Sequence, residues 1–340
     1  MRPAARFAAL AVLAGSAALA AGAAARAASA PVGERAYVSC ERAGEVAVID
    51  TKERRVVSTL PVGERPRGIQ ASSATGRVYV ALSDLESRAQ TAGDAIVVID
   101  PAQGRVLARH SAGTDPEQFA VSPDGRKLYA SNEDAGTASI TDLASGDVEA
   151  TLVVGIEPEG VAASPDGRWV YVTAETSNTV SVIDTGRAEV VASFLVDPRP
   201  RAAAFASDGK RAYVSAEIGG TVAVVDVPAH AVVATVPLPD GAWPVGVAVS
   251  PDGARVYVAN GRADSVSVLD AERLEVVATW PAGRRPWDLA LGAGGTLLYV
   301  ANGLSDDVSV LDAASGRVLG TIPVCKGPWG VALLGGADAR

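Results

Sequence analysis

Seven prolines recur along the chain, and the residue after each of them changes in chemistry from one repeat to the next. In chain order these residues are Arg67, Glu117, Glu159, Arg201, Val245, Trp287 and Trp329. A second recurring position carries Glu41, Ser83, Glu133, Glu175, Glu217, Gly261 and Gly303. Convergent charges beside an apolar platform are typical of a binding site. The sequence therefore predicts a site built from Arg67, Glu117, Glu159, Arg201, Trp287, Trp329, Glu41, Glu133, Glu175 and Glu217.

Three kinds of chemistry suit this set of residues. One arc is acidic with two arginines and the opposite arc is aromatic and glycine-lined, which suits a ligand, although the same charges could pair and merely seal a channel. Clustered oxygens of Glu133, Glu175 and Glu217 could hold a hard divalent cation, but no Asp-x-Asp-x-Asp-Gly loop supports one. Two carboxylates such as Glu133 and Glu175 could also act as acid and base. No other cofactor is expected.

Residues for nucleophilic or histidine-based catalysis are scarce. The chain has two histidines, His110 at the end of an expected outer strand and His230 in an expected turn, and neither belongs to the predicted site. It has no Gly-x-Ser-x-Gly elbow, no phosphate-binding loop and no Cys-x-x-Cys-His haem motif. A triad or a histidine general base is therefore not expected, and binding is favoured over catalysis.

A repeat of about 42 residues must position these groups. All seven tyrosines fall at one phase of it: Tyr37, Tyr79, Tyr129, Tyr171, Tyr213, Tyr257 and Tyr299. Most neighbours are 42 residues apart, and the spacing of 50 from Tyr79 to Tyr129 reflects an eight-residue expansion within "DLESRAQTAGDA". Such a period is typical of a propeller or a solenoid.

Each repeat has the pattern of four short strands, here called A to D from the axis outward. In residues 245–283 the apolar runs "VGVAV", "RVYVAN", "SVSVLD" and "VVATWPAG" alternate with turns such as "SPDG" and "AERLE". Four strands with Gly, Pro and Asp turns make one propeller blade. The aspartates of "SPDG" and "VID" are assigned to the turns rather than to a site. The fold class is therefore all-β.

Six complete A to D sets begin after the prolines at 66, 116, 158, 200, 244 and 286. The remainder is divided between the two ends, with strands B, C and D at residues 35–63 and a lone strand A at residues 329–334. Joined together, they predict a seventh, closing blade, which removes the open sheet edge. We expect a single seven-bladed propeller domain over residues 31–340.

Cys40 and Cys325 are the two cysteines of the chain. Strand B of the closing blade returns antiparallel to strand A, so the end of B lies beside the start of A. Cys40 follows that B strand and Cys325 precedes that A strand, which predicts a disulfide that locks the ring. The alternative is two unrelated buried thiols.

The units read "SPDGxxVYVxNxxxxxVSVIDxxxxxVVATxPVGxxP", which resembles the YVTN-type β-propeller repeat over residues 31–334. Segments 196–226, 244–253 and 302–332 are also similar to the β-propeller proteins associated with pyrroloquinoline quinone (PQQ)-dependent catabolism. That resemblance implies an exported accessory or binding protein found beside quinoprotein alcohol dehydrogenases and c-type cytochromes. The related haem d1 propellers need axial histidines that this spacing does not supply.

Residues 1–30 have the pattern of a secretory signal peptide, with Arg2 and Arg6 before an Ala-rich apolar run and small residues at its end. Its removal leaves 27 basic and 39 acidic side chains, a net charge of −12. Such a charge argues against nucleic acid or membrane as partner and suits a basic protein such as a cytochrome. We expect a periplasmic or secreted protein, not inserted in the membrane, that binds a quinoprotein dehydrogenase, a cytochrome c or a small ligand. The alternatives are a lactonase-like or lyase-like enzyme and a cell-surface structural protein.

Overall fold

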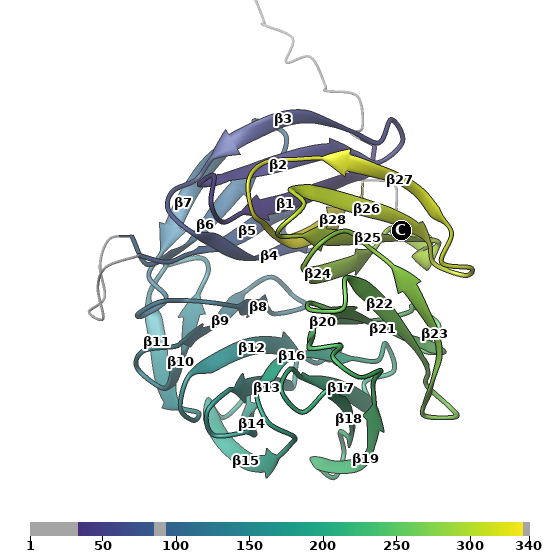
Figure 1. Ribbon diagram of the computed structural model, residues 1–340. Helices are drawn as coiled ribbons and strands as arrows, with labels where there is room; N and C mark the ends of the chain where they lie inside the picture. The colour runs from purple at the N-terminus through teal and green to yellow at the C-terminus, as the bar shows by residue number, and fades with distance from the viewer. Residues whose placement is uncertain (1–32, 85–92, 336–340) are drawn as a thin grey trace, which may run out of the picture. The chain divides into compact units, whose positions relative to one another are not determined.

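The computed structural model describes residues 33–84 and 93–335, which form seven four-stranded antiparallel sheets. The innermost strands of these sheets contact one another in cyclic order, so the sheets surround a central axis (Figure 1). The predicted all-β, seven-bladed architecture is confirmed. The predicted signal peptide and most of the expansion after Tyr79 lie outside the described residues. No helix in the described ranges is long and apolar enough to span a membrane.

Each blade is named here by its strands, given from the axis outward. The closing blade contains β28 (Pro328–Leu334), β1 (Arg35–Cys40), β2 (Glu45–Asp50) and β3 (Arg55–Pro61). The next three blades contain β4 (Pro66–Ser72), β5 (Arg77–Leu82), β6 (Ala95–Asp100), β7 (Arg105–His110); β8 (Phe119–Val121), β9 (Lys127–Asn132), β10 (Thr137–Asp142), β11 (Val148–Val153); β12 (Pro158–Ala163), β13 (Trp169–Ala174), β14 (Thr179–Asp184) and β15 (Glu189–Leu195).

The last three complete blades follow the same order. They contain β16 (Pro200–Phe205), β17 (Arg211–Ala216), β18 (Thr221–Asp226), β19 (Ala231–Pro237); β20 (Pro244–Val249), β21 (Arg255–Asn260), β22 (Ser265–Asp270), β23 (Glu275–Pro281); β24 (Pro286–Leu291), β25 (Leu297–Asn302), β26 (Asp307–Asp312) and β27 (Val318–Pro323). A single 3-10 turn, η1 (Ala293–Gly295), separates β24 from β25.

The two ends of the chain complete one sheet, as the sequence predicts. Strand β28 pairs antiparallel with β1, in a register that sets Tyr37 opposite Ala332, and Figure 1 shows the two strands side by side. The predicted disulfide is confirmed. It joins Cys40 at the end of β1 to Cys325 just before β28, with 5.8 Å between the two Cα atoms.

The place of each strand within its blade matches the burial of its residues. The second and third strands are almost wholly buried, whereas the outermost strands alternate between exposed and half-buried residues, as in β23. The recurring tyrosines lie between adjacent sheets, and Tyr171, Tyr213 and Tyr299 are fully buried. The turn aspartates cap their own turns, since Asp142 Oδ1 accepts from the N–H groups of Ala144 and Ser145 at 2.9 Å. These residues build the scaffold and leave the inner strands to carry the site.

The innermost strands carry a bulge directly after the proline. In β4, β12, β16 and β20 the pairing register shifts between the proline and the residue three positions later. The residue after the proline is thereby released from regular pairing. Bulges redirect side chains and are frequent next to functional sites.

Candidate functional site

Two groups of loops meet at one end of the channel, which we call the mouth face. They are the connections that precede each innermost strand and the loops that follow each second strand, and both carry predicted site residues. The residue before each proline has a positive φ between 37° and 67°, and only the last of the seven is glycine: Arg65, Asp115, Glu157, Arg199, Trp243, Arg285 and Gly327. Non-glycine residues seldom adopt this conformation.

The backbone holds each of these connections in place. The carbonyl of Glu157 accepts the N–H of Glu175 at 2.9 Å, and the carbonyl of Arg199 accepts the N–H of Glu217 at 2.8 Å. Equivalent bonds recur around the ring, for example from Gly303 to Arg285 at 2.8 Å. The residue before the proline and the residue after the second strand are therefore hydrogen-bonded neighbours in six of the seven blades.

Hydroxyl groups fix the residues that follow the prolines. Ser131 Oγ donates to the carbonyl of Glu159 at 2.8 Å, from the preceding blade. Thr173 Oγ1 donates to the carbonyl of Arg201 at 3.2 Å in the same way. Glu159 and Arg201 are thus each held by their own blade and by the preceding one, which favours a preorganised mouth at these positions.

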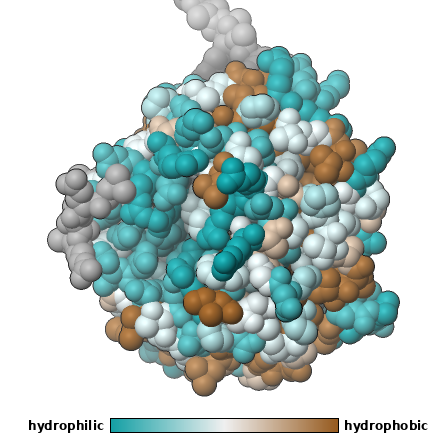
Figure 2. Space-filling model, viewed as in Figure 1, coloured by the Kyte–Doolittle hydropathy of each residue, from teal (hydrophilic) through white to brown (hydrophobic). Residues whose placement is uncertain are grey.

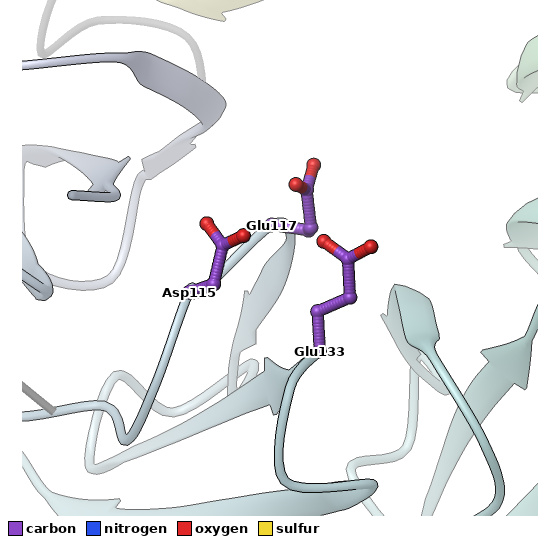
Figure 3. Close-up of side chains that lie close together, drawn as sticks. All are labelled: Asp115, Glu117 and Glu133. Carbon is purple, nitrogen blue, oxygen red and sulfur yellow. The ribbon is translucent and has the colours of Figure 1, made fainter. Parts of the chain in front are cut away.

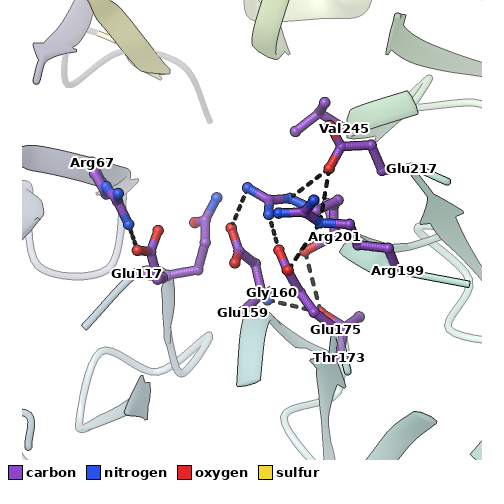
Figure 4. A network of polar contacts seen from close by, with 12 residues as sticks. Arg67, Glu117, Glu159, Gly160, Thr173, Glu175, Arg199, Arg201, Glu217 and Val245 are labelled. Atoms are coloured by element: carbon purple, nitrogen blue, oxygen red, sulfur yellow. Dashed lines mark hydrogen bonds and ion pairs between the residues drawn. The ribbon is translucent and has the colours of Figure 1, made fainter. Parts of the chain in front are cut away.

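Three arginines and three glutamates form a closed network on one side of the mouth, and Figure 4 shows Arg199 and Arg201 among the three glutamates. Arg201 pairs with Glu159 at 2.6 Å and also contacts Glu175. Arg199 Nε lies 2.9 Å from Glu175 and 3.3 Å from Glu217. Arg285 reaches Glu217 at 3.4 Å. On this side the predicted residues neutralise one another, which matches the alternative in which charges seal the channel.

The glutamates of this network are nearly inaccessible to solvent. Their side chains are only 3–8% exposed, and that of Arg201 is 10% exposed. Buried charges persist only when they are paired, because an unpaired one carries a large desolvation cost. The network therefore belongs to the structural core of the mouth.

The other side of the mouth carries an excess of carboxylates. Arg67 Nε lies 3.0 Å from Glu41, and another nitrogen of Arg67 contacts Glu117. Arg65 lies 3.6 Å from Glu41 and 3.5 Å from Asp115. In the described part of the chain no hydrogen bond or ion pair involves the carboxylate of Glu133. Among the residues named on the two sides of the mouth, five arginines therefore face seven carboxylates.

Glu133 belongs to a tight acidic group. Oxygens of Asp115, Glu117 and Glu133 lie within 4.8 Å of one another, and Figure 3 shows Glu133 directed toward Glu117. Burial, followed by the charges of Glu159 and Asp115, raises the pKa of Glu133 to about 7. The predicted cation ligands Glu175 and Glu217 are instead held by arginines. Oxygen ligands for a cation are therefore grouped at Asp115, Glu117 and Glu133.

The aromatic arc is covered by cations. Trp287 and Trp329 are stacked, with ring centroids 6.2 Å apart and planes 15° apart. The guanidinium carbon of Arg285 lies 4.2 Å from the ring centre of Trp287 and that of Arg201 lies 5.8 Å away. Gly303 is required here, because a Cβ would lie 2.5 Å from Trp287 Cδ1. The two tryptophans come together as predicted, but Trp329 is buried and Trp287 has little open face.

Below the mouth, the channel contains a cavity of about 270 Å³ lined by the inner strands. Asp288 lies on its wall, where burial raises the pKa of its carboxyl to about 6. Its Oδ2 accepts the N–H of Val331 at 3.1 Å. Asp288 was not among the residues predicted from the sequence, although it is the one acidic residue at a position where other repeats have Gly, Ala or Gln.

The residues that precede the prolines were also absent from the predicted site. Arg65, Arg199 and Arg285 each contact a predicted site residue through their side chains, and the carbonyl of Asp115 accepts the N–H of Glu133 at 3.4 Å. The sequence contained a signal for them, because the charge of the residue two positions before the strand-A site residue, which directly precedes the proline, varies between repeats as strongly as the charge of the residue after the proline. The positive φ that turns them into the mouth could not be inferred from that signal.

The raised pKa of Glu133 predicts a pH effect on stability. An unfolded Glu titrates near pH 4.3, so between about pH 4.5 and 7 the folded chain binds a proton that the unfolded chain releases. Stability therefore falls as pH rises through this window, by about 1–2 kcal/mol after a discount for partial exposure. Glu133→Gln should remove the contribution of Glu133 to this fall and leave that of Asp288, whose pKa is raised to about 6. Denaturant unfolding at about pH 5 and about pH 8 measures the difference between the variant and wild type. Glu272→Gln, an exposed control, should keep the whole fall; equal pH profiles for Glu133→Gln and wild type would contradict the prediction.

Comparison with known proteins gives two partial family matches. Residues 197–322 match the model of the lactonase seven-bladed β-propeller, and residues 80–196 match that of the cytochrome D1 haem domain. No curated protein matches the sequence. Each family match covers little more than a third of the chain, on adjacent segments.

Solved structures match over most of the chain at low identity. Hydrazine synthase of Kuenenia stuttgartiensis matches with a TM-score of 0.73 and 21% identity, over 82% of this chain and 92% of that one. A putative 6-phosphogluconolactonase of Bacteroides fragilis gives 0.74 and 18%, over 89% and 98%. One of Bacteroides uniformis gives 0.75 and 18%, over 89% and 100%. These likenesses support membership of the β-propeller class, and they carry the fold rather than an activity.

Proposed function

We propose that this chain is an exported binding and scaffold protein that acts beside PQQ-dependent alcohol oxidation. Its mouth face docks a basic partner, either a quinoprotein dehydrogenase or a c-type cytochrome, in the periplasm or outside the cell. The observation that carries the proposal is the carboxylate excess on one side of the mouth, where, in the described chain, Glu41, Asp115, Glu117 and Glu133 face only Arg65 and Arg67. A binding face gains from such charge, because complementary potentials steer a partner and fix its orientation.

The surrounding loops extend this acidic character. Asp134, Glu157 and Asp240 are exposed on loops of the mouth face, from blades β8–β11 to β16–β19. Ile156 and Ile218, which are 61% and 59% exposed, lie on loops of the same arc. Figure 2 shows such hydrophobic residues as small separate groups within a mainly hydrophilic surface. Apolar contacts within a charged rim are the usual composition of a transient protein interface.

The proposal is tested by a pull-down from native periplasm of cells grown on an alcohol. Wild type should retain a quinoprotein or cytochrome, and mass spectrometry would identify it together with any metal or small molecule. Asp134→Lys with Asp240→Lys should weaken this binding roughly tenfold, and added salt should weaken wild-type binding similarly.

The matched control reverses two charges on the opposite face. Asp147→Lys with Glu272→Lys changes the net charge equally, since both residues are exposed on turns between third and outer strands. This control should bind the partner as wild type does. If both double variants lost binding equally, the net charge alone would explain the effect. If wild type recovered neither a quinoprotein nor a cytochrome, the proposal would be contradicted.

A second candidate function is lactone hydrolysis at the mouth. The lactonase match over residues 197–322 favours it, as does the pKa of about 7 of Glu133, which suits a general base near neutral pH. Against it stand the arginine pairs that occupy Glu159, Glu175 and Glu217. A lactone turned over by wild type but not by Glu133→Gln would favour the enzyme over the binding protein.

A further inference from the structure

A cavity of about 970 Å³ lies in the seam between blades β4–β7 and β8–β11, away from the channel. We call it the seam cavity; it is lined by residues 107–110 of β7, by the start of β5, and by residues 125–127 and 142–146 of the next blade. The corresponding cavities in two other seams measure about 500 and 440 Å³. The repeat places equivalent residues in each seam, so differences between these residues account for the larger volume of the seam cavity.

The smaller seam between blades β20–β23 and β24–β27 is closed by two side chains that cross it. Arg255 Nη1 donates to the carbonyl of Ala314 at 2.7 Å, and Tyr257 Oη donates to the carbonyl of Ala313 at 2.8 Å. Both acceptors belong to the turn between the third and outer strands of the next blade.

The equivalent residues of the seam cavity remain within their own blade. Arg77 Nη1 pairs with Asp100 at 3.3 Å, and Tyr79 Oη donates to Thr75 Oγ1 at 3.1 Å. The carbonyl of Leu143, which corresponds to that of Ala313, receives no donor from any described residue. The seam cavity therefore presents an acceptor that the other seam uses for closure.

A third difference lies at the end of the outer strand. Six residues before the next proline, β23 has Trp280, whose indole packs so closely on Gly316 that a Cβ there would clash with it. At the same phase β7 has His110, which faces Gly146 with a smaller imidazole ring. In the described chain the ring of His110 makes no hydrogen bond, and burial lowers its pKa. Histidine in place of tryptophan thus leaves room for a ring.

Most charges around the seam cavity are paired with carboxylates. Arg77 lies 3.3 Å from Asp100, Lys127 lies 3.0 Å from Asp142, and Arg126 lies 3.8 Å from its neighbour Asp124. Arg109 has no carboxylate partner in the described chain, but its guanidinium lies beside Gly63 and donates to the carbonyl of Val62 at 3.3 Å. The open groups are the Leu143 carbonyl and the neutral imidazole of His110, beside apolar atoms of Leu107 and Ala108.

We propose that the seam cavity binds a neutral, flat heteroaromatic compound that carries an N–H donor. Its ring occupies the part of the space filled by the indole of Trp280 in the equivalent seam that the smaller imidazole of His110 leaves open, and its N–H donates to the carbonyl of Leu143. A second polar atom of the compound pairs with His110. This site lies in a blade seam and is independent of the partner docking proposed for the mouth face.

Indole is the direct probe, because it is the group that Trp280 supplies elsewhere. Ligand-observed NMR should give a saturable signal with a dissociation constant on the order of 1 mM, as expected for so small a ligand. Benzofuran has the same shape with oxygen in place of the N–H, and it should bind about tenfold more weakly because the Leu143 carbonyl is then left unpaired. No saturable signal with indole, or equal binding of both compounds, would overturn the proposal.

Variants locate the probe within the molecule. His110→Trp should abolish indole binding, because the new side chain fills the cavity as Trp280 does. Ala108→Leu is a second blocking variant on the cavity wall, for use if the first fails to fold. Val233→Trp adds an indole at an exposed position of another outer strand and should leave binding unchanged. Indole binding that survives in a folded blocking variant would place the site elsewhere and overturn the proposal.

Discussion

Arg201→Met is expected to destabilise the protein more than any other single change at the mouth. The guanidinium of Arg201 contacts Glu159 and Glu175 and lies 3.8 Å from Glu217, all of them nearly inaccessible to solvent. Methionine preserves much of the side-chain volume but removes the charge. Removal of one partner from a buried ion network costs about 3–5 kcal/mol, since the remaining charges are left without compensation. Denaturant unfolding at neutral pH measures this loss.

The cause can be separated from simple loss of packing. Glu159→Gln added to Arg201→Met should restore part of the free energy of unfolding, because one uncompensated carboxylate disappears, and a double-mutant cycle gives the coupling. Arg187→Met is the matched surface control. Arg187 pairs with Glu189 at 2.7 Å, but both side chains are more than half exposed, so its removal should change stability little. Equal losses for Arg187→Met and Arg201→Met would refute the buried-network explanation.

The blades could be predicted because the repeat places equivalent residues at a nearly constant spacing. A tyrosine, an aspartate and a proline at constant spacing define where strands begin and end, and the two incomplete ends then have one way to close the ring. The disulfide between Cys40 and Cys325 follows from that topology without knowledge of side-chain geometry. Backbone order could thus be predicted from pattern alone.

The pairing of the mouth residues could not be predicted in the same way. Glu133 and Glu217 occupy the same phase of the repeat, yet Glu133 is unpaired whereas Glu217 contacts Arg199. The difference lies in the residue before each proline, which is Asp115 beside Glu133 and Arg199 beside Glu217. That residue faces the mouth only because its φ is positive, a property that depends on the packing of the connection and not on local preference.

Both the carboxylate excess and the closed arginine network depend on which residue precedes the proline. Where this position carries arginine, as at Arg199 and Arg285, the neighbouring glutamates are neutralised and become structural. Where it carries Asp115, Glu133 has no arginine partner among the described residues, and burial followed by the charges of Glu159 and Asp115 raises the pKa of Glu133 to about 7. Binding chemistry and rigidity are therefore distributed around the mouth by the residues that precede the prolines.

Removal of the disulfide is the second large effect that we expect, and it should act at one seam. The bond spans 285 residues and joins the two strands that close the ring, so Cys40→Ala with Cys325→Ala should cost roughly 2–5 kcal/mol of unfolding free energy. Strand β28 is then held at this edge mainly by its pairing with β1. Beside the disulfide, Arg42 and Lys326 both pair with Asp306, at 2.8 and 2.7 Å, and these exposed ion pairs stabilise the same seam more weakly.

Hydrogen exchange distinguishes local opening of the ring from uniform loss of stability. In the double alanine variant, the amides of β1 and β28 should exchange much faster than those of β13 and β14 on the opposite side of the ring, because the freed edge opens before the rest unfolds. Reduced wild type should behave as the variant does, which controls for the substitutions themselves. An exposed edge also recruits other chains, so the variant should self-associate at high concentration. Equal acceleration of exchange in all blades would show that the disulfide stabilises the whole ring and not the closing blade in particular.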